Sequence, residues 1–142
     1  MMNERIIALD IGDVRIGVAV SDPTRTIASP LDVITRIGWG PDTRAVKAIC
    51  DRFDTQIVIS GLPLNMDGTE GFQAKKVREF CTQLSNAGLT AFFQDERLTT
   101  VSAEDILLED HTSRHLRKKV VDKIAASLIL EEWLLSQKNN KE

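Results

Sequence analysis

The chain of 142 residues has few aromatic residues, no tyrosine and only two cysteines. Because aromatic residues make up 5% of the chain, we do not expect extensive stacking on nucleic-acid bases. Cys50 and Cys81 lie at apolar positions of expected helices, outside any CxxC or histidine-rich cluster. We therefore expect two buried free thiols in a reducing compartment, without a disulfide or a zinc site.

The sequence also lacks an excess of positive charge and a long apolar run. A net charge of -3 excludes a globally basic nucleic-acid binder but leaves room for a local basic patch. No window approaches the roughly 18 apolar residues of a membrane span, and no signal-peptide cleavage region follows the N-terminus. We expect a cytoplasmic protein with no membrane partner, folded as one domain over residues 1–142.

Three apolar segments at the start of the chain predict three antiparallel strands. Residues 5–10 and 15–21 are separated by a short polar break, which is typical of a hairpin. Residues 26–34 supply a third strand, and Pro30 predicts that this strand lies at an edge or contains a bulge.

Helices and strands alternate in the rest of the chain. We expect strands at 57–60 and 90–94, each preceded by a helix, and the first of these helices is capped by Asp42 or Thr43. Strands joined by helices run parallel, so both should run parallel to the first strand. The predicted fold class is α/β, with a mixed five-stranded sheet flanked by helices.

Three acidic residues are expected at one edge of this sheet, because sites in open α/β sheets lie beyond the carboxyl ends of parallel strands. Asp10 ends the first expected strand and Glu96 follows the last one. Asp122 lies in the first two turns of a final helix, 118–136, on the face of its core residues. Taken singly, Asp10 also suits a turn, Glu96 an ion pair with Arg97 or a helix start, and Asp122 a helix N-terminus.

Three inward carboxylates without an evident basic partner would repel one another. A divalent cation removes this repulsion, and Mg²⁺ or Mn²⁺ prefers such oxygen ligands. Two ions about 4 Å apart could hold the attacking water and the leaving oxygen of a phosphoryl transfer. The pattern thus favours a metal-dependent site formed by Asp10, Glu96 and Asp122.

Polar residues near this set are candidate contacts for a nucleic-acid backbone. The Gly/Pro-rich loop GLPLNMDG, the segment DERLTT and the basic run RHLRKK all lie near the expected site. Each segment also has a plainer explanation. GLPLNMDG suits a turn-rich loop, DERLTT a helix cap, and the basic run a solvated, irregular connection over 111–117. Gly12 and Gly17 would leave room for metal and phosphate. The candidate substrate contacts are Arg15, Asn65, Asp67, Arg97, Thr99, Lys118 and Lys119.

Four segments, LDIGDVRIGVAVSD, VISGLPLNMDGTEG, DERLTT and VVDKIAASLIL, together resemble the YqgF family over essentially the whole chain. These RuvX-type proteins are similar to Holliday-junction resolvases. The resemblance implies an RNase H-like fold and a Mg²⁺-dependent nuclease that matures the 5′ end of pre-16S rRNA in ribosome biogenesis. It also implies that Asp10, Glu96 and Asp122 are the catalytic and metal-binding acids.

Other functions stay open from the sequence. A Holliday-junction-type DNA resolvase could use the same site. The chain could also be a non-catalytic binding module that docks on ribosomal particles, nucleic acid or another protein. The first segment also resembles the phosphate-binding hairpin of actin-like ATPases and sugar kinases, but 142 residues leave no room for their second domain. The oligomeric state cannot be read from the pattern.

Overall fold

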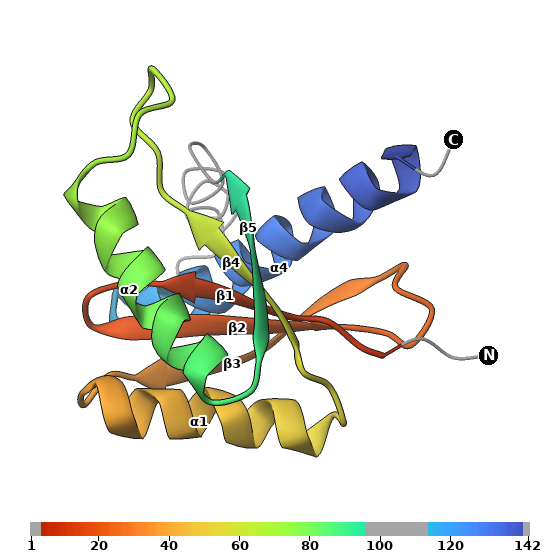
Figure 1. Ribbon diagram of the computed structural model, residues 1–142, viewed down its shortest axis with the longest axis horizontal. Helices are drawn as coiled ribbons and strands as arrows, with labels where there is room; N and C mark the ends of the chain where they lie inside the picture. Colours follow the sequence, from red (N-terminus) through yellow and green to blue (C-terminus); the bar gives the residue numbers. More distant parts are fainter. Residues whose placement is uncertain (1–3, 96–113, 141–142) are drawn as a thin grey trace.

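The computed structural model describes residues 4–95 and 114–140, which form one mixed sheet and three helices (Figure 1). The sheet has five strands in the order β3-β2-β1-β4-β5. Its elements are β1 (Ile7–Ile11), β2 (Arg15–Ser21), β3 (Ala28–Thr35), α1 (Trp39–Arg52), β4 (Ile57–Leu62), α2 (Phe72–Asn86), β5 (Thr90–Asp95) and α4 (Arg114–Asn140).

The strand directions confirm the predicted fold class. Strands β1, β2 and β3 pair antiparallel, whereas β4 pairs parallel with β1 and β5 pairs parallel with β4. Pro30 lies in the edge strand β3, where the register shifts between Val18 and Ala19 of β2. Both alternatives predicted for Pro30, an edge and a bulge, therefore hold, because an edge strand tolerates a residue without an amide donor.

The two faces of the sheet are covered by different helices (Figure 1). Alternate residues of β1, including Ile7 and Leu9, pack with the apolar faces of α1 and α2 in one core cluster. Ala8 points to the other face and packs with α4, in a cluster that includes Ala126 and Ile129. The period of two along the strand thus assigns each β1 side chain to one of two layers.

Helix α1 begins earlier than the sequence predicts. It starts at Trp39, so neither Asp42 nor Thr43 is its N-cap residue. The Asp42 carboxylate instead accepts hydrogen bonds from the amides of Ile37 and Gly38, at 2.9 and 3.4 Å. The acidic side chain still satisfies amides at the start of the helix, but from a position inside it.

Helix α2 ends as predicted at the NAGL segment. Ala87 is its C-cap, and Gly88 follows with a φ of +97°. Glycine adopts this left-handed conformation without the steric cost that a Cβ atom brings.

Helix α4 also begins earlier than predicted, at Arg114. The expected irregular connection is therefore wrong for 114–117, while the rest of that connection and the helix expected to follow Thr99 lie outside the described residues. Ala125 and Ala126 are fully buried, and Ala126 packs with side chains of the sheet in one core cluster. None of the described helices is both long and apolar enough to span a bilayer.

The two cysteines are free and buried, as predicted. Cys50 lies in α1 and Cys81 in α2, and both belong to the core between these helices and the sheet. Burial raises the pKa of the Cys50 thiol to about 12 and that of Cys81 to about 11. Both thiols are therefore core side chains that stay protonated at neutral pH.

Candidate functional site

The carboxyl ends of the three parallel strands meet at one edge of the sheet. The register pairs Leu9 of β1 with Ser60 of β4, and Leu62 of β4 with Asp95 of β5. The antiparallel strand β2 starts at this same edge, because Ile11 pairs with Ile16. This carboxyl edge is the place that the fold offers for a site.

Asp10 lies at the carboxyl edge on the face covered by α4. It follows the fully buried Ala8 by two residues, so the alternation of the strand places both on the same face. Asp10 is half-buried, and its partner across the β1–β2 ladder is Gly17. Strand β1 continues to Ile11, so Asp10 is its penultimate residue and not its last one as predicted.

Gly17 brings helix α4 into contact with strand β2. A Cβ atom on Gly17 would lie 1.9 Å from the carbonyl oxygen of Asp122 and 2.3 Å from its carbonyl carbon. The backbone of α4 therefore occupies the space that a side chain at position 17 would need. The prediction that Gly17 leaves room for metal or phosphate is wrong. Gly17 therefore has two neighbours that matter for the site: it pairs with Asp10 across the ladder and contacts the backbone of Asp122.

Asp122 has a basic partner that the sequence pattern does not predict. The Arg15 guanidinium donates from Nε to Oδ2 of Asp122 at 2.6 Å, and the two side chains are 23% and 24% exposed. Asp122 is the ninth residue of α4, so it lies beyond the first two turns where the helix dipole favours an anion. The charge of Asp122 is balanced by Arg15, and the expectation of unpartnered carboxylates is wrong for this residue.

A second arginine fixes the β1–β2 hairpin that leads from Asp10 to Arg15. Arg36 donates from Nη1 to the carbonyl oxygen of Gly12 at 2.8 Å and from Nε to Oδ2 of Asp42 at 3.0 Å. Its guanidinium also lies over the ring of Phe80, 5.1 Å from the centroid. The hairpin is therefore tied to both α1 and α2.

The carboxylate of this network is almost fully buried. Asp42 is 1% exposed. Burial raises its pKa, but hydrogen bonds from Ile37, Arg36 and Gly38 together outweigh that effect, so the pKa of the Asp42 carboxyl lies below its ordinary value. Sequence reasoning missed this network, and its only signal was an acid beside a predicted helix start.

The third predicted carboxylate, Glu96, lies outside the described residues, as do Arg97 and Thr99. The preceding residue, Asp95, follows Phe93 by two positions and shares its face, the one covered by α1 and α2. Asp95 is therefore on the opposite face from Asp10. Among the side chains that the structure describes, no three of His, Cys, Asp or Glu are grouped closely enough to hold a metal ion.

The loop between β4 and α2 is held by its own polar side chains. Asn65 donates from Nδ2 to Thr69 Oγ1 at 2.9 Å, and Asp67 Oδ1 accepts from the Thr69 amide and hydroxyl at 3.0 and 2.7 Å. Arg78 of α2 forms a bidentate pair with Glu70, which lowers the pKa of that carboxyl. Asn65 and Asp67 thus help to fold an exposed loop at the carboxyl edge.

Lys118 and Lys119 belong to helix α4 and precede Asp122 by four and three residues. Residues at these spacings lie on one side of a helix, about one turn apart. The structure brings these two lysine positions to the helix turn next to the Arg15–Asp122 pair.

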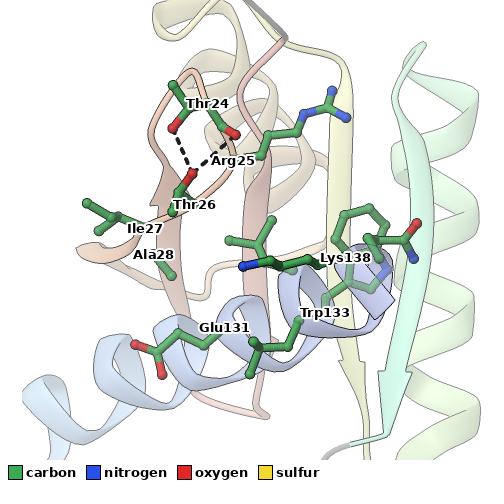
Figure 2. A pocket seen from close by; sticks show the side chains of 11 residues that line it. Thr24, Arg25, Thr26, Ile27, Ala28, Glu131, Trp133 and Lys138 are labelled. Carbon is green, nitrogen blue, oxygen red and sulfur yellow. Dashed lines mark hydrogen bonds between the residues drawn. The ribbon is translucent and has the colours of Figure 1, made fainter. Parts of the chain in front are cut away.

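A cavity of about 580 Å³ lies at the other end of the sheet (Figure 2). It is lined by the turn between β2 and β3 and by the C-terminal half of α4. Trp133 lines it, with its ring centroid 6.2 Å from that of Phe92, and Ile27 and Leu135 are each 61% exposed. None of the predicted site residues lines this cavity.

A protein-family match and two similar named proteins agree on one family for this chain. The RuvX family, described as Holliday junction resolvase, matches residues 4–136. A protein of Clostridium botulinum (strain Hall) named "Putative pre-16S rRNA nuclease" is 45% identical over 92% of this chain and 96% of its own length. A protein of the same name from Clostridium kluyveri is 46% identical over the same shares.

Solved structures support the same architecture. Thermus thermophilus RuvC in complex with a Holliday junction has a TM-score of 0.58 at 14% identity, with 96% of each chain covered. The Fowlpox virus resolvase with its Holliday junction has a TM-score of 0.53 at 18% identity, and the match covers 94% of this chain and 98% of that one. At these identities the likeness concerns the fold alone, which is that of the RNase H-like resolvases.

Proposed function

Because this chain belongs to the RuvX family, we propose that it is a nuclease that hydrolyses a phosphodiester bond at the carboxyl edge of its sheet, with pre-16S rRNA as its substrate. The observation that supports the proposal is that Asp10 and Asp122 both adjoin Gly17 on one face of the sheet. Gly17 pairs with Asp10 and touches the backbone of Asp122. Two acids that lie 112 positions apart in sequence are thus neighbours of one residue, which supports a site at this edge.

The acidic residues fit a divalent cation by their donor chemistry. Asp10 and Asp122 offer only carboxylate oxygens, which are the hard ligands that Mg²⁺ and Mn²⁺ prefer. We propose that these two residues and Glu96 hold the metal, with two ions when substrate is bound. When bound, the ions would supply an activated water and charge stabilisation at the leaving oxygen.

The basic residues have a separate part in this proposal. Arg15 lies beside Asp122, and a nucleic-acid phosphate that approaches the acids would meet its guanidinium. Lys118 and Lys119 would neutralise neighbouring phosphates of the same strand. Arg97, Thr99, Asn65 and Asp67 would extend the contact surface along the carboxyl edge.

The choice of RNA rests on the relatives. Both Clostridium proteins carry a name that refers to pre-16S rRNA, and the match to this chain covers 96% of their length. We propose that this chain trims the 5′ end of the same precursor. A junction resolvase is the second candidate, because the family description and the two solved neighbours name Holliday junctions.

A cleavage assay with both substrates separates the two candidates. The purified chain would be incubated with pre-16S rRNA and, separately, with a four-way DNA junction, in Mg²⁺ and in Mn²⁺. We expect cleavage of the RNA near the mature 5′ end and little cleavage of the junction. Symmetric cuts in the junction with an intact RNA would instead assign the resolvase activity, and an intact pair of substrates would contradict both.

The lysines can be tested through binding alone. Replacing Lys118 and Lys119 by glutamine should weaken RNA binding and reduce the slope of log K against log salt by about 2, because roughly one counterion is released per phosphate contact. Lys47→Gln, on helix α1, is the matched single-charge control. An unchanged salt slope in the double variant would remove both lysines from the interface.

A further inference from the structure

We propose that Arg15 couples nucleic-acid binding to metal binding by exchanging its partner, from the Asp122 carboxylate to a phosphate of the bound strand. Arg15 is then a positioning residue that governs when Asp122 is available to a cation. This inference rests on the proposed function and adds an order of events to it. The structural basis is the 2.6 Å contact between Arg15 Nε and Asp122 Oδ2.

Arg15 and Asp122 lie at the carboxyl edge, where the proposed function places both the phosphate and the cation. Arg15 is the first residue of β2, at the carboxyl edge, and its backbone is fixed by a hydrogen bond from the Gly12 amide to the Arg15 carbonyl at 2.9 Å. Its side chain lies on the same face of the sheet as Asp10, because it precedes Gly17, the partner of Asp10, by two residues. A phosphate at the acids is therefore within reach of an anchored arginine.

The electrostatics of the pair set the direction of the coupling. A guanidinium bound to a carboxylate offsets the negative charge that would attract a divalent cation, and its own charge repels that cation. The pair is only partly buried, with side chains 23% and 24% exposed, so solvent and salt still screen the attraction between its two charges. This single Nε–Oδ2 contact can be exchanged for a bidentate guanidinium–phosphate contact, which forms two hydrogen bonds.

Exchange makes the two binding events favour each other. When a phosphate takes the guanidinium, Asp122 regains its full charge toward a cation, and when a cation takes Asp122, the guanidinium is released to a phosphate. Such a coupling is reciprocal, so each ligand raises the affinity for the other by the same factor. The nuclease would then bind its metal tightly only when a strand is in place.

Mn²⁺ titration of the free protein, followed by electron paramagnetic resonance, tests the first half of the inference. We expect Arg15→Gln to bind Mn²⁺ about threefold to tenfold more tightly than the unchanged chain, because one positive charge next to the carboxylate is lost. Arg15→Lys, which keeps that charge, should stay within about twofold of the unchanged chain. Lys47→Gln removes a charge from a pair of equal length, 2.6 Å to Asp51, on α1, and should not change the affinity.

RNA binding in EDTA tests the second half. The same Arg15→Gln variant should bind RNA more weakly, with a salt slope that is lower by about 1, because a phosphate contact is lost. A substitution that tightens Mn²⁺ binding and weakens RNA binding cannot be explained by a damaged site, which would weaken both. Urea unfolding of each variant confirms that the fold is intact.

The possible failures are distinguishable. If Arg15→Gln leaves the Mn²⁺ affinity unchanged or lowers it, Arg15 is a strut between β2 and α4 and the coupling is wrong, whether or not the chain cleaves RNA. If the unchanged chain binds no Mn²⁺ even with RNA present, the metal site of the proposed function fails together with this inference. If Mn²⁺ binding shifts as expected but no substrate is cut, the coupling stands and the proposed substrate is wrong.

Discussion

Replacing Gly17 by alanine would place a methyl carbon 1.9 Å from the carbonyl oxygen of Asp122. Ordinary contacts of a Cβ atom begin at 3.4 Å, so helix α4 would have to move away from β2 by about 1.5 Å. The neighbouring atoms belong to a helix backbone, which cannot change rotamer as a side chain does. Overpacking of this kind costs about 1–3 kcal/mol, and the rigid neighbour places Gly17→Ala at about 3 kcal/mol.

The same displacement would act on the site. Asp122 would move with α4, away from Asp10, and a misplacement on the order of 1 Å costs about 100-fold in rate. Urea unfolding should show a lower midpoint with an unchanged m-value, and the melting temperature should fall by roughly 10 °C. RNA cleavage at a temperature where the variant is folded should drop about 100-fold.

Gly40→Ala is the matched control for this substitution. Gly40 lies in α1, and a Cβ atom there would meet only the end of the flexible Arg44 side chain, at 3.4 Å. Alanine favours a helix over glycine, so this variant should be as stable as the unchanged chain or up to about 1 kcal/mol more stable. If Gly17→Ala proved as stable and as active as Gly40→Ala, the close approach of α4 to β2 would be refuted.

Three further predictions concern the support of the site and the core. Asp42→Asn should lower the free energy of unfolding by about 3 kcal/mol at neutral pH, since it breaks a buried pair with Arg36. Folding lowers the pKa of Asp42, so its ionised carboxylate stabilises the fold at any pH above the unfolded pKa of about 3.9. This stabilisation is lost as the pH falls through the folded pKa, and the variant should therefore show less acid destabilisation than the unchanged chain. Cys50 and Cys81, with pKa values raised to about 12 and about 11, should resist iodoacetamide at pH 8 until urea unfolds the chain, and rapid labelling of the folded chain would contradict their burial. Gly88→Ala should cost about 1 kcal/mol in urea unfolding through the backbone alone, because a Cβ atom there meets nothing within 4 Å.

The sheet could be predicted because its signals are local. Strand β2 has the predicted bounds, since alternation over Arg15–Ser21 assigns one face to each core cluster. The parallel direction of β4 and β5 followed from the helices that precede them. Pro30 marked the edge strand because proline cannot donate to a second neighbour.

Helix starts were predicted less well, because the signals are ambiguous. Residues 114–117 are basic and polar, a composition shared by loops and by solvated helix turns, so the start of α4 was placed four residues too late. This error moved Asp122 from the third turn of the helix to its beginning and suggested a dipole effect that the structure does not support. The start of α1 was misjudged for a similar reason. Asp42 lies inside the helix, and its carboxylate accepts a hydrogen bond from the amide of Ile37, which precedes the helix.

Contacts between distant segments could not be read from the sequence at all. Nothing in the pattern pairs Arg15 with Asp122, which lies 107 positions further along the chain. The function of Gly17 was also misread, because only the packed structure shows that helix α4 occupies the space of its side chain. The candidate acids were found by topology, whereas their partners depend on packing.

Metal-dependent cleavage by the two described acids tests the central proposal most directly. Asp10→Asn and Asp122→Asn would be compared with the unchanged chain and with Asp51→Asn, an exposed acid on α1, on pre-16S rRNA in Mg²⁺. We expect the unchanged chain and Asp51→Asn to release the same 5′ fragment, and both site variants to lose more than about 100-fold in rate while keeping their fold. Equal cleavage by Asp10→Asn and the unchanged chain, or cleavage that persists in EDTA, would contradict a metal-dependent site at the carboxyl edge.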